Sequence, residues 1–140
     1  MIPVEDLKKE NKNISDLMGV LSILISNTDL RDNQIFCDLL HRFNDSVQAH
    51  LAHEDRSVYT ELLDHTDKTV NDLAQQFMSN THELQRLLGQ FTKDCRESRL
   101  SKKTSSEFLS DTREICRIVD SRIKLENEKL FPIISKLEAA

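Results

Sequence analysis

The sequence has few of the residues that break helices or build turns. In 140 residues it contains two glycines, two prolines, a single tyrosine and no tryptophan. Strand-rich proteins need many turns, and glycine and proline are the residues that turns use most. The long stretches without either residue argue against a β-protein. They favour an all-α chain that forms one domain over residues 1–140.

Cysteine and long apolar runs are also scarce. Cys37, Cys95 and Cys116 are widely spaced and form no CxxC pair, which argues against a disulfide framework or a zinc knuckle. The first residues, MIPVEDLKKE, lack the apolar core of a signal peptide, and nowhere do about 18 apolar residues run together. We therefore expect a cytoplasmic protein without a membrane partner.

The charge of the chain argues against nucleic-acid binding. The formal net charge is −5, and acidic and basic residues are interspersed along the sequence instead of forming blocks. One basic cluster stands beside the polar stretch SKKTSSE, and we interpret it as a solvated loop in preference to a phosphate-binding patch. Its members are Arg96, Arg99, Lys102 and Lys103.

The spacing of apolar residues predicts four amphipathic helices. The first begins just after Pro3 and runs to about residue 27, and the second covers about residues 33–63. The third follows the connector LDHTDK, and a polar connector over residues 94–106 separates it from the fourth. Four helices of this length with short connectors predict an antiparallel up-down-up-down four-helix bundle.

The fourth helix has a start signal and an apolar stripe. Thr104 and Glu107 have the spacing of a capping box, which closes the first turn of a helix. The residues expected to face inward are Phe108, Ile115, Val119, Ile133 and Leu137. Between Val119 and Ile133 the same line passes through Arg122 and Glu126, so charged residues interrupt it.

Polar residues interrupt the inward stripes of the other three helices as well. In the first helix Asn11 lies on the line that joins Leu7 and Ile14, and the stripe of the second helix continues onto His50 and Glu54. In the third helix the line passes through Thr81, and His82 is rotated about 100° toward the flank. We expect these interruptions to share one level and to form a single buried polar layer.

Inward-facing carboxylates and imidazoles are the side chains from which helical bundles build metal sites. The one-turn spacing of His50 and Glu54 aims both groups at one ion. The segments LKKEN, HLAHEDRSVYTELL and RIKLENEKLFPII resemble the hemerythrin-like (HHE cation-binding) bundles, and the resemblance spans nearly the whole chain. It implies an antiparallel four-helix bundle. In better-known members it implies a non-haem di-iron centre that binds oxygen, handles nitric oxide or senses iron and oxygen.

The resemblance implies a depleted set of metal ligands. Three residues match ligand positions of the family pattern: His50, Glu54 and Glu126. Three others occupy ligand positions with side chains that the pattern does not have: Asn11, Thr81 and Arg122. His82 is a fourth candidate ligand, because a π-bulge near Asn80 would swing it inward.

Arg122 stands one turn before Glu126, and a permanently charged guanidinium competes with a metal for carboxylates. We therefore expect no cofactor and no enzymatic activity. The sequence favours a regulatory or interaction bundle, a monomer or homodimer with an unidentified protein partner. The alternative is a protein that binds non-haem iron or another divalent metal between His50, Glu54 and Glu126, and that senses or carries oxygen, nitric oxide or redox state.

Overall fold

The computed structural model of the chain describes residues 2–26, 34–97 and 105–139. Within these ranges the backbone is almost entirely helical and contains no strand. The first helix, α1 (Val4–Ile25), begins after Pro3, and Glu5 and Asp6 lie in its first turn. Carboxylates at this position interact favourably with the positive end of the helix dipole. The predicted start of this helix is confirmed.

Two of the long helices are each built from three consecutive elements, in which a π-turn joins two α-helical segments. The second long helix consists of α2 (Gln34–His53), η2 (Glu54–Val58) and α3 (Tyr59–Leu63). The last consists of α5 (Ser105–Leu125), η4 (Glu126–Leu130) and α6 (Phe131–Ala139). Between them lies α4 (Lys68–Glu97), which is α-helical throughout.

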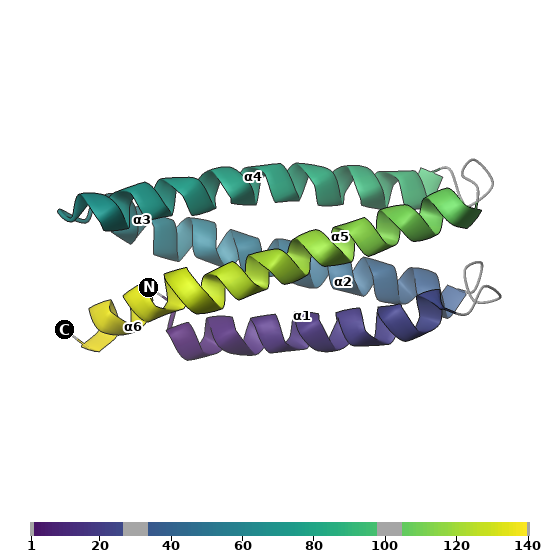
Figure 1. Cartoon of the computed structure of the whole chain (residues 1–140), viewed down its shortest axis with the longest axis horizontal. Coiled ribbons are helices and arrows are strands. Elements are labelled where there is room, and N and C mark those ends of the chain that lie inside the picture. Colours follow the sequence, from purple (N-terminus) through teal and green to yellow (C-terminus); the bar gives the residue numbers. More distant parts are fainter. Residues whose placement is uncertain (1, 27–33, 98–104, 140) are drawn as a thin grey trace.

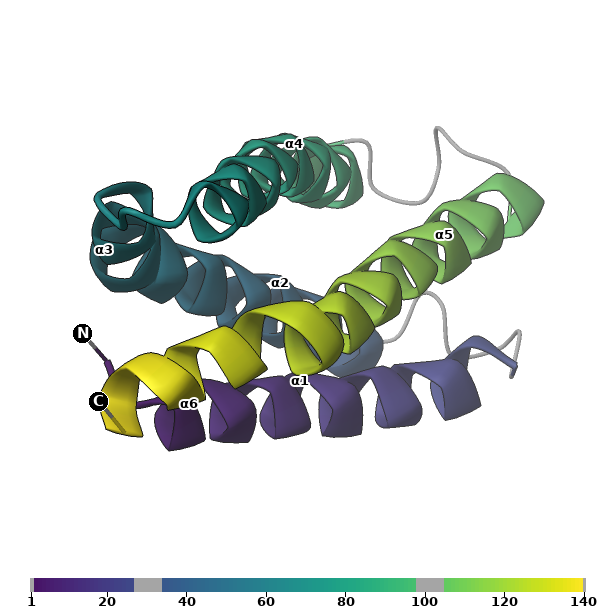
Figure 2. The ribbon, with the colours of Figure 1, turned by 60° about the vertical axis from the view of Figure 1, so that its left-hand side comes forward.

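The long helices pack side by side as an antiparallel bundle (Figure 1). Helix α1 contacts α2 on one side and α5 with α6 on the other, and α4 contacts α2 and α3 as well as α5. Both chain ends lie at the same end of the bundle in two views that differ by 60° (Figure 2). The predicted up-down-up-down four-helix bundle is therefore confirmed.

The core consists of two apolar clusters with polar residues between them. One cluster includes Leu21, Phe36 and Leu88, and it fills the half of the bundle where α1 ends and α2 begins. The other includes Leu7, Tyr59 and other side chains near the chain ends. The polar residues that interrupt the stripes are buried between these clusters. Their hydrogen bonds to one another confirm the predicted polar layer.

The π-turn in the last helix changes which residues face inward. The sequence pattern predicted that Ile133 and Leu137 are buried, but both are only partly buried and Ile134 is fully buried instead. A π-turn holds one residue more than an α-turn, so every position after it shifts by one. Because η4 precedes Ile134, the inward position moves from 133 to 134.

The helix ends near the last connector also differ from the prediction. We expected a connector over residues 94–106, but α4 continues to Glu97 and α5 begins at Ser105. Thr104, the predicted capping residue, lies outside the described part of the chain, as do the side chains of the basic cluster and of Phe108, although the backbone of Arg96 belongs to α4. The π-bulge suggested near Asn80 is wrong, since α4 has no such turn. Within the described ranges no helix combines the length and apolar character needed to cross a membrane.

Candidate functional site

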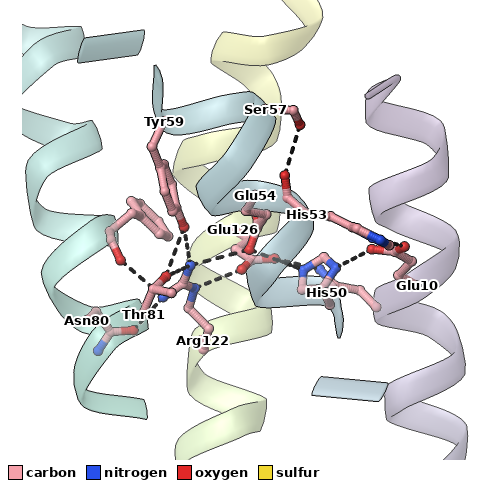
Figure 3. A network of polar contacts seen from close by, with 12 residues as sticks. Glu10, His50, His53, Glu54, Ser57, Tyr59, Asn80, Thr81, Arg122 and Glu126 are labelled. Carbon is pink, nitrogen blue, oxygen red and sulfur yellow. Dashed lines mark hydrogen bonds and ion pairs between the residues drawn. The ribbon is translucent and has the colours of Figure 1, made fainter. Parts of the chain in front are cut away.

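Six buried polar residues from all four long helices meet in the middle of the bundle, and Figure 3 labels all of them except Asn11. None of their side chains is more than 4% exposed. They are Asn11 of α1, His50 of α2, Glu54 of η2, Thr81 of α4, Arg122 of α5 and Glu126 of η4. We call this group the polar layer.

Local helix geometry explains how the two glutamates of the layer come to face inward. Glu54 is the first residue of η2, and Glu126 is the first residue of η4. In an uninterrupted α-helix, residues spaced by four drift about 40° around the axis at each step. The extra residue of the π-turn absorbs this drift. Val58 and Leu130, four residues after the two glutamates, therefore also face inward and are 0% exposed.

The Arg122 guanidinium lies against both glutamates. Its Nε donates to Glu126 Oε2 over 2.7 Å, and its Nη2 donates to Glu54 Oε1 over 3.3 Å. Nη2 also donates to Thr81 Oγ1 over 2.9 Å and to the hydroxyl of Tyr59. A buried charge is tolerated only when it is paired and hydrogen-bonded, and Arg122 meets both conditions.

The outer edge of the guanidinium faces α4. Nη1 donates to Asn80 Oδ1 over 2.7 Å and to the backbone carbonyl oxygen of Phe77 over 3.4 Å. The guanidinium carbon also lies 4.9 Å from the centre of the Phe77 ring, within the range of a cation–π interaction. Helix α4 therefore fixes the orientation of Arg122 with uncharged groups, and the carboxylates lie along the other edges.

A chain of contacts connects the polar layer with the surface. His50 Nε2 lies 2.8 Å from Glu126 Oε1, and His50 Nδ1 lies 2.8 Å from Glu10 Oε1. The other oxygen of Glu10 lies 2.7 Å from His53 Nδ1. The side chains of Glu10 and His53 are 27% and 36% exposed, so they mark the solvent end of this chain. Asn11 Nδ2 donates to Glu126 Oε1 over 3.0 Å and closes the layer on the α1 side.

The network sets the charges of its members. Burial disfavours the charged form of His50, but the hydrogen bonds to Glu10 and Glu126 outweigh burial and raise the pKa of His50 to about 10. Burial alone would raise the pKa of Glu126, but His50 and Arg122 together lower it to about 2. For Glu54, burial and the neighbouring charge of Glu126 prevail, and its pKa rises well above the ordinary value. At neutral pH, two cations therefore face the carboxylate of Glu126.

Three residues of the layer could hold a metal ion. One ligand atom each from His50, Glu54 and Glu126 lies within 4.8 Å of the other two. Glu54 Oε2 and Asn11 Oδ1 are buried and have no hydrogen-bond partner among the described residues, so two oxygens are available. Three of the four candidate ligands that the sequence indicated therefore lie in one cluster.

The fourth candidate, His82, is not brought to this cluster. Its side chain is 60% exposed, and Nε2 lies 3.8 Å from Asp55 Oδ1 on the outside of the bundle. Its neighbour Thr81 faces inward, and the hydroxyl oxygens of Thr81 and Tyr59 lie 3.1 Å apart. Because α4 keeps α-helical geometry, Thr81 and His82 point about 100° apart.

The residues present do not fit a di-iron centre. The layer contains a single imidazole, and both nitrogens of His50 are already bound to carboxylates. The guanidinium of Arg122 occupies an oxygen of each glutamate, and arginine cannot be deprotonated to become a ligand. A single cation that uses the free Glu54 Oε2 would still have to displace a partner of Glu126, because both oxygens of Glu126 are bound.

Sequence reasoning missed four residues of the network: Glu10, His53, Tyr59 and Asn80. Glu10 directly precedes Asn11, and Tyr59 lies five residues after Glu54, so each is close in sequence to a residue that was identified. The spacing of His50, Glu54 and Val58 by four residues each was the available signal for a π-turn. Such a turn brings Tyr59 to the core.

Comparison with known proteins gives one match. The model of the family described as Hemerythrin HHE cation binding domain matches residues 2–134. No curated protein and no solved structure matches the chain significantly. The matched range contains every residue of the polar layer.

Proposed function

The chain belongs to the hemerythrin HHE cation-binding family, and on this premise we propose that it is a regulatory bundle that acts through a protein partner and not through a di-iron centre. The observation that carries the proposal is the buried Arg122, which donates hydrogen bonds to both Glu54 and Glu126. Arg122 and His50 supply, inside the bundle, the positive charge that a metal centre would bring.

Charge balance supports this reading. Buried carboxylates are stable only next to compensating cations, and removing one member of a buried ion pair is strongly destabilising. In this chain the compensation is built from side chains, so folding does not depend on a metal. A bundle that folds without a di-iron centre is suited to present a stable surface to a partner.

Metal analysis tests the absence of a di-iron centre. The protein is expressed in iron-rich medium, purified without chelator and analysed for iron per chain and for the absorption of an oxo-bridged pair. We expect far less than one iron per chain. The matched control is the Arg122→His, Asn11→His double variant, which restores two nitrogen donors and should retain more iron. Two irons per wild-type chain would overturn the proposal.

The regulatory half of the proposal needs its own measurement. We expect the tagged chain, expressed at its natural level in its own cells, to elute in a complex of fixed stoichiometry with a second protein. Because the interaction does not depend on a di-iron centre, an iron chelator should leave this complex intact. A chain that elutes alone or only as a homodimer would contradict the proposal, as would a complex that dissociates on chelation.

A second function is favoured by the cluster of His50, Glu54 and Glu126 and by the partnerless Glu54 Oε2. In this alternative a single iron or other divalent ion binds there, and the protein senses or carries oxygen, nitric oxide or redox state. A ligand that binds only the folded state raises the melting temperature with its concentration. A melting temperature that ignores added Fe(II) would exclude this alternative. A rise that Glu54→Gln abolishes would establish the site.

A further inference from the structure

A cavity opens on the face of the bundle between α4 and the last long helix, beside the polar layer. It has a volume of about 240 Å³ and is lined by Leu73, Gln76, Phe77, Asn80, Leu125 and Lys129. A neighbouring cavity of about 390 Å³ shares Leu73, Gln76 and Lys129 with it. We call the two together the Lys129 groove. Small-molecule sites begin at roughly 300 Å³, so the larger cavity is within this range and the smaller one lies just below it.

The smaller cavity borders the polar layer at two of its lining residues, Phe77 and Asn80. Asn80 and Phe77 are the residues whose oxygens accept hydrogen bonds from Arg122 Nη1. The Asn80 side chain is on the surface, and the guanidinium behind it is 4% exposed. One edge of the Arg122 guanidinium has no carboxylate beside it. The neutral side-chain oxygen of Asn80 lies between this edge and solvent.

The composition of the groove suits an anion with an apolar body. Leu73, Phe77 and Leu125 form apolar walls, and Leu125 is 41% exposed, so an apolar surface is open to a ligand. Lys129 lines both cavities, and its side chain is exposed. The acidic residue of the groove, Asp72, lines only the larger cavity.

We propose that the Lys129 groove binds a small organic monocarboxylate. The carboxylate takes the place of the Asn80 amide oxygen at Arg122 Nη1, Lys129 supplies the second cation, and the apolar body packs on Leu73, Phe77 and Leu125. A hydrogen bond from a guanidinium to a carboxylate is roughly twice as strong as one to a neutral acceptor, so the exchange is favourable. The inference rests on the proposed function, because it needs Arg122 as a permanent cation in the layer.

Binding of such a ligand would regulate the bundle by changing the contacts of Arg122. A ligand bound at Nη1 contacts the same guanidinium that donates hydrogen bonds to Glu54, Glu126 and the hydroxyl of Tyr59. With the hydrogen bond from Arg122 to Thr81 of α4, these contacts join three of the four long helices, and occupation of the groove is therefore coupled to them.

The test is an NMR titration of the full, metal-free chain with benzoate, and with benzamide as the uncharged probe of the same shape. We expect benzoate to shift the side-chain amide of Asn80 and the backbone amides of Leu73 and Leu125 in a saturable way. Benzamide should bind about tenfold more weakly, which corresponds to about 1.4 kcal/mol. Equal binding of the two probes, or no saturable shift at these residues, would overturn the proposal.

Substitutions distinguish a loss of benzoate affinity that is caused by a removed charge from one that is caused by unfolding. Lys129→Gln should weaken benzoate binding about fivefold with an unchanged melting temperature, since Lys129 is exposed. Lys136→Gln, the same change on α6 outside the groove, should bind as the wild type does. Asn80→Asp should also weaken binding, because it places a built-in carboxylate at Arg122. Unchanged affinity in Lys129→Gln would contradict the assignment.

The same samples distinguish the two proposals. Two irons per chain would reject the proposed function, whatever benzoate does. An iron-free chain that ignores benzoate would reject the groove assignment alone.

Discussion

Arg122 Nε and Glu126 Oε2 lie 2.7 Å apart across a single helical turn, with the two side chains 4% and 0% exposed. The other oxygen of Glu126 accepts from His50 and from Asn11. Both oxygens of Glu126 are therefore bound, whereas Glu54 has one oxygen without a partner. This asymmetry shifts the two pKa values in opposite directions. The pKa of Glu126 is lowered, which favours its charged form, and the pKa of Glu54 is raised, which favours its neutral form.

Removing the guanidinium should destabilise the bundle strongly. Arg122→Met keeps most of the side-chain volume but leaves two glutamates buried beside a single cation. Breaking a buried ion pair in this way costs about 3–5 kcal/mol, so we expect a loss of that size in the free energy of unfolding. Urea denaturation followed by circular dichroism measures it.

The matched control is Arg117→Met. Arg117 lies on the same helix and forms an ion pair with Glu114, but both side chains are more than half exposed. Exposed ion pairs contribute roughly 0–1 kcal/mol, so this variant should unfold almost as the wild type does. Equal losses in the two variants would mean that the buried contacts of Arg122 do not stabilise the fold.

The polar layer was predictable because helical periodicity is a local property. Apolar stripes fixed the inward line of each helix, and the polar interruptions at Asn11, Thr81 and Arg122 were visible on it. The chemistry of arginine indicated that Arg122 would pair with the buried carboxylates, and its hydrogen bonds to Glu54 and Glu126 agree with this. Here sequence and structure give the same answer.

The π-turns and the partners outside the stripes were not predicted. Single π-turns inside α-helices are rare, so sequence patterns seldom reveal them. In this chain both begin at a glutamate one turn after a basic residue, with an aromatic residue five positions further on. His50, Glu54 and Tyr59 repeat this pattern at Arg122, Glu126 and Phe131. Glu10 and Asn80 lie on helix flanks, where periodicity does not distinguish a solvated side chain from one that bonds a neighbouring helix.

Histidine at position 122 should convert the layer toward metal binding. Arg122→His removes a permanent cation and adds a nitrogen donor, so we expect lower stability without metal and higher affinity for iron. Asn11 faces Glu126 from α1, so adding Asn11→His should increase the affinity for iron further. Denaturation of the metal-free proteins and titration with Fe(II) measure the two effects. If Arg122→His is neutral in stability and free of iron, the assignment of the buried network fails.

The pKa of Glu126 predicts how stability depends on pH. Its folded-state pKa of about 2 lies below the ordinary 4.5, so the unfolded chain binds this proton more tightly than the folded chain. The stabilisation from Glu126 is therefore complete above about pH 4.5 and is lost as the pH falls toward 2. We expect Glu126→Gln to be less stable than the wild type at about pH 6, and the difference to shrink below about pH 4.5.

Glu54→Gln serves as the comparison for that pH series. The pKa of Glu54 is raised, so its charged form is disfavoured by folding and its neutral replacement should lose less stability than Glu126→Gln near neutral pH. Denaturation midpoints at several pH values give both curves. A Glu54→Gln variant that loses more than Glu126→Gln would reverse the assignment of the two glutamates.

Tyr59 reports on the integrity of the layer, because it is the single tyrosine of a chain without tryptophan. Its side chain is 1% exposed, and burial together with the charge of Glu54 raises its pKa above the ordinary value of 10. The hydroxyl therefore stays protonated as long as it lies between Thr81 and Arg122. We expect the absorbance of the phenolate to appear on alkaline titration only when the bundle unfolds.

Absorbance and circular dichroism recorded on the same alkaline titration test this expectation. The raised pKa of His50, about 10, means that its stabilising charge is also lost in this range, so unfolding and ionisation should coincide. The same chain in concentrated urea is the control, and there Tyr59 should ionise near its ordinary pKa. A phenolate that forms while the helical signal is intact would place the Tyr59 hydroxyl in solvent, and the contact between Tyr59 and Arg122 would then be wrong.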